Sequence, residues 1–526
     1  MTIDGVSGRT SYIGSGILDL RSQLDTLTQQ LASGKVSTTY AGQGSGRSLA
    51  IGLRSQLAKL DSYADTAVNV NTRIQVANLS LQRLADIGSS VKGAAVSAGS
   101  TLDNTGQTAG QKTASLGFFD SVDMLNAQSG DRYLFSGRAT DTAPVAPADQ
   151  IMNGNGATIA GLKTVISERK QADLGTGGLG RVTTSMGATA TSVKITEDDP
   201  TGPLTAPPLP PAAQPFGLKL TGVSTAIVGA SVTQPVDLPA TVPPAVPAAA
   251  VSKSMSVDLG TTNPQIGDQV KFTFQLPDGT SEDVVMTATA TAKTPMDANT
   301  FLIGATTAAT AASLNTELGK SMSALANGPL VAASAMAAGK DFFGEPPMRV
   351  SGTPLGASTT LVAGTKANTV IWYQGETGTD SARGTAVAQV DQGITVQYGA
   401  RADEQALRSQ LQNVAVFAAV TTSATDPNAN AQIAALNQRV AQNLATVPGT
   451  QTIQDIQADF AGAQASVKAT TDRQVQTKVI SQTMLDSIEG INNDEVATKI
   501  LALQTALQAS YQTTSKLYQM SLVKFL

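Results

Sequence analysis

The stretch ILDLRSQLDTLTQQLASGK (17–35) decides the fold class of this chain. Its apolar residues recur at alternating spacings of three and four, at Ile17, Leu20, Leu24, Leu27 and Leu31. This is the a/d pattern of a coiled-coil helix, and the Gly34 that follows is typical of a helix C-cap. Because so narrow an apolar stripe suits packing against another helix, the pattern predicts a helix that pairs with a helical partner.

The same spacing extends over both ends of the chain. It predicts a second helix from about Arg47 to Ala98 and a helix that begins after INNDE (491–495). Asn492 or Asn493 can cap this last helix, and the acids that follow suit a helix N-terminus. We name the predicted helix-packing positions the seam residues: Leu20, Leu24, Leu27, Leu31, Leu57, Leu60, Ile74, Leu81, Val496, Ile500, Leu503, Leu507 and Leu517.

Proline separates the two helical ends from the middle of the chain. Of the 23 prolines, 20 lie between Pro144 and Pro347. Since proline disrupts helix interiors, we expect few helices there beyond a short one at 307–325. Alternating apolar residues on both sides of Pro277-Asp278-Gly279 predict a β-hairpin. Further strands that return to the helices are predicted around Val370, Trp372 and Tyr373 and around Val390, Ile394, Val396 and Tyr398.

These patterns together predict an α+β protein. Both chain ends form a long antiparallel helical coiled-coil base, and one or two β-rich domains are inserted in the middle. We expect an N-terminal helical arm, β-rich outer domains rich in Pro, Thr and Ala, strands returning to the base, and a C-terminal helical arm, over 1–140, 141–349, 350–398 and 399–526 respectively.

Composition argues against most enzyme chemistry. The 526 residues include no His and no Cys, which excludes Cys/His zinc sites, Ser-His-Asp triads and disulfides. A GxGxxG match at 175–180 and SxxK matches at 89–92 and 167–170 lack the neighbouring elements that those motifs require. We therefore predict no enzyme activity and no catalytic, cofactor-binding or metal-binding residues. A net charge of −5 gives no footprint for nucleic acid, and no apolar stretch is long enough to insert in a membrane.

Four segments carry a resemblance to a known family. They are LDTLTQQLASGK (24–35), GDRYLFSGRATDTAPV (130–145), VQYGARADEQALRSQLQNVA (396–415) and DEVATKILALQTALQASYQTTSKLYQMSLVKFL (494–526). The chain resembles the bacterial flagellin family, and most closely its hook–filament junction branch. The most specific segments are the C-terminal one and the YLFSG motif, which is Tyr133, Leu134, Phe135, Ser136 and Gly137.

The resemblance implies an extracellular structural subunit of the bacterial flagellum. Such subunits are exported by the flagellar type III apparatus, and the first residues, MTIDGVSGRT, lack the features of a cleaved signal peptide. The expected partners are other copies of the chain, hook-side and filament-side axial proteins, and an export apparatus or chaperone. In the family the paired terminal helices stack with those of neighbouring subunits, and the middle domains project outward.

Several alternatives stay open at this stage. Within the flagellum, the chain could instead be a filament flagellin. Outside it, a secreted adhesin-like module could use the helices as a stalk, and an enzyme could work with carboxylates alone. The heptads themselves also fit a helical bundle within one chain.

Overall fold

The computed structural model describes residues 4–97, 99–156, 158–198, 214–235 and 253–523. Its internal contacts divide the chain into two units. The first unit comprises Met1–Thr72, Ala388–Val396 and Gly462–Leu526. The second unit comprises Arg73–Val387 and Gln397–Ala461. The long helices α2 and α10 each contribute to both units.

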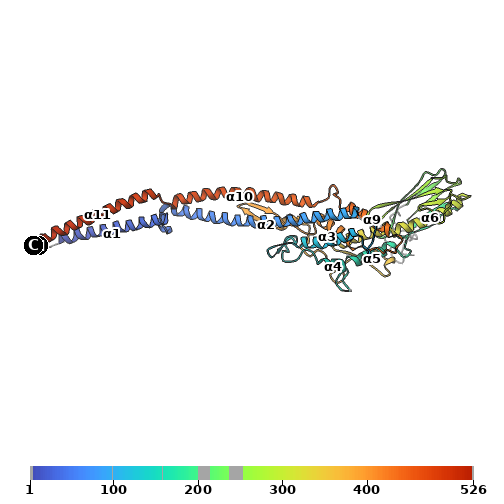
Figure 1. Ribbon diagram of the computed structural model, residues 1–526, viewed down its shortest axis with the longest axis horizontal. Helices are drawn as coiled ribbons and strands as arrows, with labels where there is room; N and C mark the ends of the chain where they lie inside the picture. The colour runs from blue at the N-terminus through green and yellow to red at the C-terminus, as the bar shows by residue number, and fades with distance from the viewer. Residues whose placement is uncertain (1–3, 98, 157, 199–213, 236–252, 524–526) are drawn as a thin grey trace, which may run out of the picture. The chain divides into compact units, whose positions relative to one another are not determined.

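Helices from both ends of the chain build the first unit. Its elements are α1 (Asp4–Ser33), η1 (Tyr40–Gly46), the first part of α2 (Arg47–Ser97), most of the hairpin β13 (Val387–Asp391) and β14 (Ile394–Gln397), the later part of α10 (Ile453–Glu489) and α11 (Asn493–Val523). In this unit α1 packs along α11 in antiparallel fashion, and α2 lies beside α10 (Figure 1). The predicted helical base formed by both chain ends is confirmed.

Local sequence signals set the ends of these helices. Gly34 has a φ of 68°, the left-handed conformation that glycine adopts at a helix C-terminus, and α1 ends just before it. At the start of α11, Asn492 Oδ1 accepts hydrogen bonds from the backbone N–H groups of Asp494 and Glu495, at 3.0 and 3.3 Å. Asn492 is therefore the cap, as one of the two predicted residues.

The second unit combines helices with two four-stranded sheets. One sheet has the strand order β10-β9-β8-β5 and the other β3-β4-β7-β6. Its helices, besides parts of α2 and α10, are α3 (Ala109–Leu125), α4 (Ala148–Asn153), α5 (Leu162–Leu174), α6 (Thr307–Asn327), α7 (Pro329–Phe342), α8 (Gln405–Ala419), α9 (Ala429–Asn443), η3 (Leu355–Ala357) and η4 (Ala382–Thr385). Its strands are β1 (Gln128–Ser129), β2 (Arg132–Tyr133), β3 (Val182–Met186), β4 (Ser192–Glu197), β5 (Lys219–Thr225), β6 (Ser231–Thr233), β7 (Ser254–Asp258), β8 (Gln269–Gln275), β9 (Ser281–Thr289), β10 (Thr300–Leu302), β11 (Met348–Val350) and β12 (Leu361–Ala363).

The predicted hairpin and the predicted short helix share one core. β8 and β9 pair antiparallel, with Phe272 opposite Val284, and the alternate side chains of β8 are buried. Thr306 caps α6 by accepting a hydrogen bond from the backbone of Ala309, at 3.2 Å. The apolar stripe of α6, which includes Leu314 and Leu318, packs into the core of the two sheets. Both predictions are confirmed.

The middle of the chain holds more helix than its prolines predict. α7 begins with Pro329 at its first turn, where the missing N–H group costs nothing and the fixed φ favours the helix. Gly339 lets α7 approach α8, because a Cβ there would lie 2.3 Å from Val416 Cγ2. The prediction that prolines exclude further helices from this part of the chain is therefore wrong for α7.

The strand predicted around Val370, Trp372 and Tyr373 is also corrected. These residues lie outside the strands, and only single bridges pair them, such as Tyr373 with Val145. Trp372 is buried because it packs on Phe343, and its indole N–H donates to the Phe343 carbonyl at 3.1 Å. Aromatic packing beyond the end of α7, rather than sheet pairing, explains this apolar run. The strands predicted around Val390 and Ile394 are present as β13 and β14.

Candidate assembly surface

The seam residues of α1 and α11 lie where these helices pack. Val496 and Leu507 are buried in α11, and Ile500 and Leu503 are half-buried. Leu20, Leu24 and Leu27 of α1 are also half-buried. Leu31 and Leu517 are largely exposed. One partner helix therefore covers these seam residues only in part.

The seam residues of α2 are covered more completely. In the first unit, Leu60 is buried and Leu57 packs against a small cluster of Ala50, Leu53 and Leu485. In the second unit, Ile74 and Leu81 are almost fully buried. These α2 positions are thus satisfied within a single chain.

A second apolar surface lies on α10, outside the predicted seam. We call it the α10 outer face; its members are Val475, Val479, Ile480 and Met484, which are between 44% and 61% exposed. On a helix, residues four apart are neighbours, so Val475 with Val479 and Ile480 with Met484 form two apolar ridges, about 140° apart around the helix. The buried Gln474, Ser481 and Leu485 occupy the opposite side of the helix, which packs into the first unit. These four residues do not share one heptad stripe, so the sequence pattern alone does not mark them; their exposure follows from the packing of α10.

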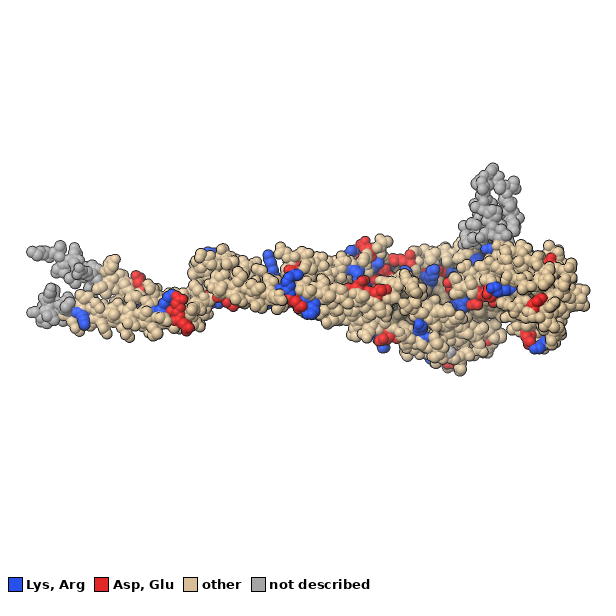
Figure 2. All heavy atoms as spheres, turned by 90° about the horizontal axis from the view of Figure 1, so that it is seen from above, with Lys and Arg blue, Asp and Glu red and all other residues tan. Residues whose placement is uncertain are grey.

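Charged side chains around the α10 outer face are paired within the chain. Lys478 Nζ lies 2.6 Å from Asp61 Oδ1, and Arg473 Nη2 lies 2.5 Å from Asp391 Oδ2. On the face drawn in Figure 2, uncharged residues cover most of the surface and charged residues occur in small groups. Burial of the α10 outer face against a partner would therefore desolvate few unpaired charges.

Further exposed apolar residues lie on the neighbouring helices of the first unit. They are Tyr12 and Leu18 on α1 and Leu501, Tyr511, Leu517 and Tyr518 on α11. Single exposed apolar residues are ordinary, but repetition along adjacent helices marks an interaction surface.

The YLFSG motif forms backbone hydrogen bonds with residues 400–402 in the second unit. Phe135 and Ser136 are fully buried, while Tyr133 and Leu134 are half-buried. The Phe135 carbonyl accepts a hydrogen bond from the Ala402 N–H at 2.8 Å, and the Gly137 N–H donates to the Ala400 carbonyl at 3.2 Å. Segments 130–145 and 396–415 are therefore in direct contact.

Gly137 is the position in this motif where only glycine fits. Its φ is 66°, and an added Cβ would lie 2.6 Å from Glu376 Oε2. This close approach lets the Glu376 carboxylate accept a hydrogen bond from the Arg138 backbone N–H at 2.6 Å. Glu376 also forms an ion pair with the Arg138 guanidinium, at 2.5 Å.

Buried charges fasten the start of α8 to the start of α10. The Arg383 guanidinium binds the Glu404 carboxylate and lies over the ring of Phe460, 4.8 Å from its centroid. Glu404 Oε2 also accepts from Gln451 Nε2 at 3.1 Å. Nearby, burial raises the pKa of the Asp403 carboxyl, and the Arg401 guanidinium opposes that rise. This cluster holds structure together, because each of its charges faces an opposite one.

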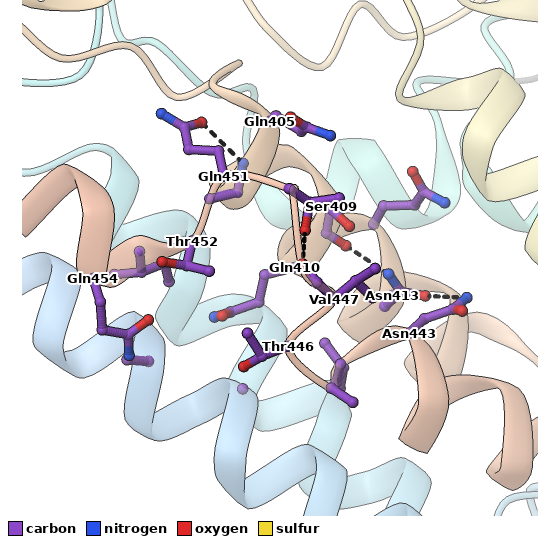
Figure 3. A pocket seen from close by; sticks show the side chains of 18 of the residues that line it. Gln405, Ser409, Gln410, Asn413, Asn443, Thr446, Val447, Gln451, Thr452 and Gln454 are labelled. Carbon is purple, nitrogen blue, oxygen red and sulfur yellow. Dashed lines mark hydrogen bonds between the residues drawn. The ribbon is translucent and has the colours of Figure 1, made fainter.

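A pocket of about 390 Å³ lies between α2, α8 and the connection from α9 to α10. Asn443 Nδ2 donates to Asn413 Oδ1 at 3.1 Å (Figure 3). Gln410 Nε2 donates to the Leu84 carbonyl at 2.5 Å. Its lining consists of amide, hydroxyl and apolar side chains and contains no Asp, Glu, Lys, Arg or Tyr. This pocket therefore offers hydrogen bonds but no acid or base for catalysis.

The GxGxxG and SxxK matches lie in ordinary structural positions. Gly175, Gly177 and Gly180 follow helix α5 and precede strand β3, the reverse of the order in dinucleotide-binding folds. Ser89 and Ser167 lie within α2 and α5. Within the described ranges, no group of three acidic residues could hold a metal ion. The described helices are also too short or too polar to cross a membrane.

Comparison of the chain with protein-family models and with curated proteins finds no match.

Proposed function

We propose that this chain is a structural subunit of the bacterial flagellum that assembles through its terminal helices, and that it is a hook–filament junction protein rather than an enzyme. The observation that carries the proposal is the α10 outer face, where Val475, Val479, Ile480 and Met484 stay exposed although their helix is already paired. In the same unit, the seam residues Leu20, Leu24 and Leu27 of α1 are half-buried, and Leu517 of α11 is exposed.

Assembly gives these side chains a physical role. Exposed apolar area costs about 25 cal/mol per Å² relative to burial, so neighbouring helices that cover the two ridges of α10 would gain stability. The flanking Lys478–Asp61 and Arg473–Asp391 pairs can stay at the rim, where paired charges need little desolvation. Long helices with narrow apolar stripes on more than one side are typical of arrays of packed helices.

The junction role rests on the YLFSG segment and on the contact that it makes. Phe135 and Gly137 join the residues that leave the helical base to Ala400 and Ala402, where the chain re-enters it. This pairing favours the junction branch, because both segments resemble that branch of the family.

Photo-crosslinking in purified flagella tests the proposal. A benzophenone side chain replaces Val479, and the variant is produced in the native bacterium in place of the original chain. Irradiation of the assembled flagella should join it to a second copy or to another axial protein. The same variant before assembly should give no adduct.

A valine away from the α10 outer face provides the matched control. Val228, in the second unit, is 83% exposed, so a benzophenone there reports on exposure alone. We expect several-fold less adduct from position 228 than from position 479. Equal yields at both positions, or no adduct at 479 in flagella that contain the chain, would contradict the proposal.

A further inference from the structure

In the first unit, the break between α1 and α2 lies beside the break between α10 and α11. α1 ends at Ser33 and α10 ends at Glu489, and the connections that follow lie against each other. The Val36 N–H donates to the Glu489 carbonyl at 2.7 Å, and the Ile491 N–H donates to the Gly34 carbonyl at 3.2 Å. We call this paired interruption, residues 34–46 and 489–492, the joint.

The Glu489 carboxylate is the centre of the joint. The residue is only 5% exposed. Its Oε2 accepts from Arg54 Nη2 at 2.6 Å, and its Oε1 accepts from Gln43 Nε2 at 3.2 Å. Lys35 Nζ lies 3.8 Å from Oε2. The Glu489 side chain at the end of α10 therefore contacts three segments: the connection after α1, through Lys35; η1, through Gln43; and the second turn of α2, through Arg54.

The partners of Glu489 are themselves fixed. Arg54 Nη1 donates to the Tyr40 hydroxyl at 3.1 Å, and the guanidinium lies over the Tyr40 ring, 5.4 Å from its centroid. The hydrogen bond from Arg54 holds the pKa of Glu489 below its usual range, with smaller contributions from Gln43 and Lys35. Glu489 is thus a carboxylate, and the positive groups around it favour that form.

Two features indicate that the joint is built around this contact. Gly46 passes so close to α10 that a Cβ would lie 2.8 Å from Ile488 Cγ2. The Oε1 atom of Gln43 is buried without a hydrogen-bond partner, while its Nε2 donates to Glu489. An orphaned buried acceptor is costly, so the Gln43 side chain is held where it serves the carboxylate.

We propose that Glu489 is the latch of the joint. Its carboxylate holds residues 34–46 against the end of α10, so that the α1/α11 and α2/α10 helix pairs keep one relative direction. Neutralisation of this carboxylate frees the two helix pairs to change the angle between them. A single carboxylate receives groups from three parts of the chain, Lys35, Gln43 and Arg54, so its loss weakens all three contacts at once. The importance of this latch for assembly rests on the proposed function, whereas the latch itself does not.

Amide hydrogen exchange of the full, unassembled chain tests the latch. Glu489→Gln keeps the shape of the side chain but removes its charge. It should accelerate exchange at 35–46 and at 490–492 by about tenfold, the effect of losing one hydrogen bond to a charged group. Exchange in the middle of α2 and in α11 beyond its first turn should stay unchanged.

Glu495→Gln is the matched control. Glu495 is an exposed glutamate at the start of α11, paired with Lys499 at 2.7 Å. Its replacement should leave exchange in the joint within about twofold of the original chain, since exposed pairs contribute little. Arg54→Gln should accelerate the joint as Glu489→Gln does, and the double variant should exchange no faster than the faster single variant.

Three results would overturn the latch. They are equal exchange in the 489 and 495 variants, acceleration spread evenly over α2 and α11, and additive effects of the Arg54 and Glu489 changes. Each of these readings comes from the unassembled chain. Failure of the latch is therefore distinguishable from failure of the proposed function, which is read in flagella.

Discussion

Two leucines on α11 show how much the position of a single residue matters. Leu507 is 7% exposed, on the side of α11 that packs in the first unit, whereas Leu501 is 64% exposed on the same helix. Heptad spacing identified Leu507 as a seam residue and left Leu501 out. The heptad pattern does not distinguish buried from exposed positions. It therefore predicts the exposed Leu517 as a seam residue together with the buried ones.

Leu507→Asp should destabilise the α1/α11 pair by about 3 kcal/mol, because it places an unpaired charge where an apolar side chain packs. Amide exchange of α11 in the full chain measures this loss. Leu501→Asp should change it by less than about 0.5 kcal/mol, as expected for an exposed site. Assembly should fail with Leu507→Asp. Equal exchange in the two variants would contradict the packing of α1 on α11.

At the scale of elements, the β13–β14 hairpin is fastened to α10 by two contacts. Gln474 Nε2 donates to the Val390 carbonyl at 2.6 Å, and Arg473 pairs with Asp391 at 2.5 Å. The hydrogen bond from Arg473 holds the pKa of Asp391 below its usual range. The ion pair therefore stabilises the hairpin above the ordinary pKa of aspartate, about 3.9, and this stabilisation is lost as the pH falls through the lower pKa of the folded state.

Asp391→Asn should loosen the hairpin at neutral pH by at most about 1 kcal/mol, because Arg473 is half-exposed and solvent screens the pair. Hydrogen exchange of 388–396, corrected for the intrinsic effect of pH, measures this. In the original chain the hairpin should loosen as the pH falls below the ordinary pKa of aspartate, about 3.9, and in the variant this acid step should be absent. Asp472→Asn, which removes the exposed Lys468 pair on the same helix, should retain the step. An unchanged acid step in the 391 variant would contradict the role of this ion pair.

Element boundaries in this chain were predictable where local chemistry alone sets them. The cap at Asn492, the left-handed Gly34 and the hairpin turn at 277–279 depend on a few adjacent residues, and each lies where the sequence predicts. Helix α7 and the buried Trp372 depend instead on neighbours distant in the chain, such as Val416 and Phe343. Such tertiary contacts override local propensity, so a single sequence does not contain them in readable form.

At the scale of the whole molecule, the α+β class and the helical base from both chain ends followed from heptads and proline distribution. The candidate assembly surface followed only in part. The seam residues were readable because they repeat every three or four positions, whereas the α10 outer face appears once the pairing of α10 with α2 is known. Whether an apolar side chain is free to contact a partner can be judged only after its contacts within its own chain are known.

Imaging of the labelled chain in intact flagella tests the central claim most directly. A small tag placed in the second unit, away from the terminal helices, reports position and copy number along the flagellum. We expect one short band between hook and filament. Signal along the whole filament would replace the junction role with that of a filament flagellin, and absence of the chain from the flagellum would contradict a flagellar function altogether.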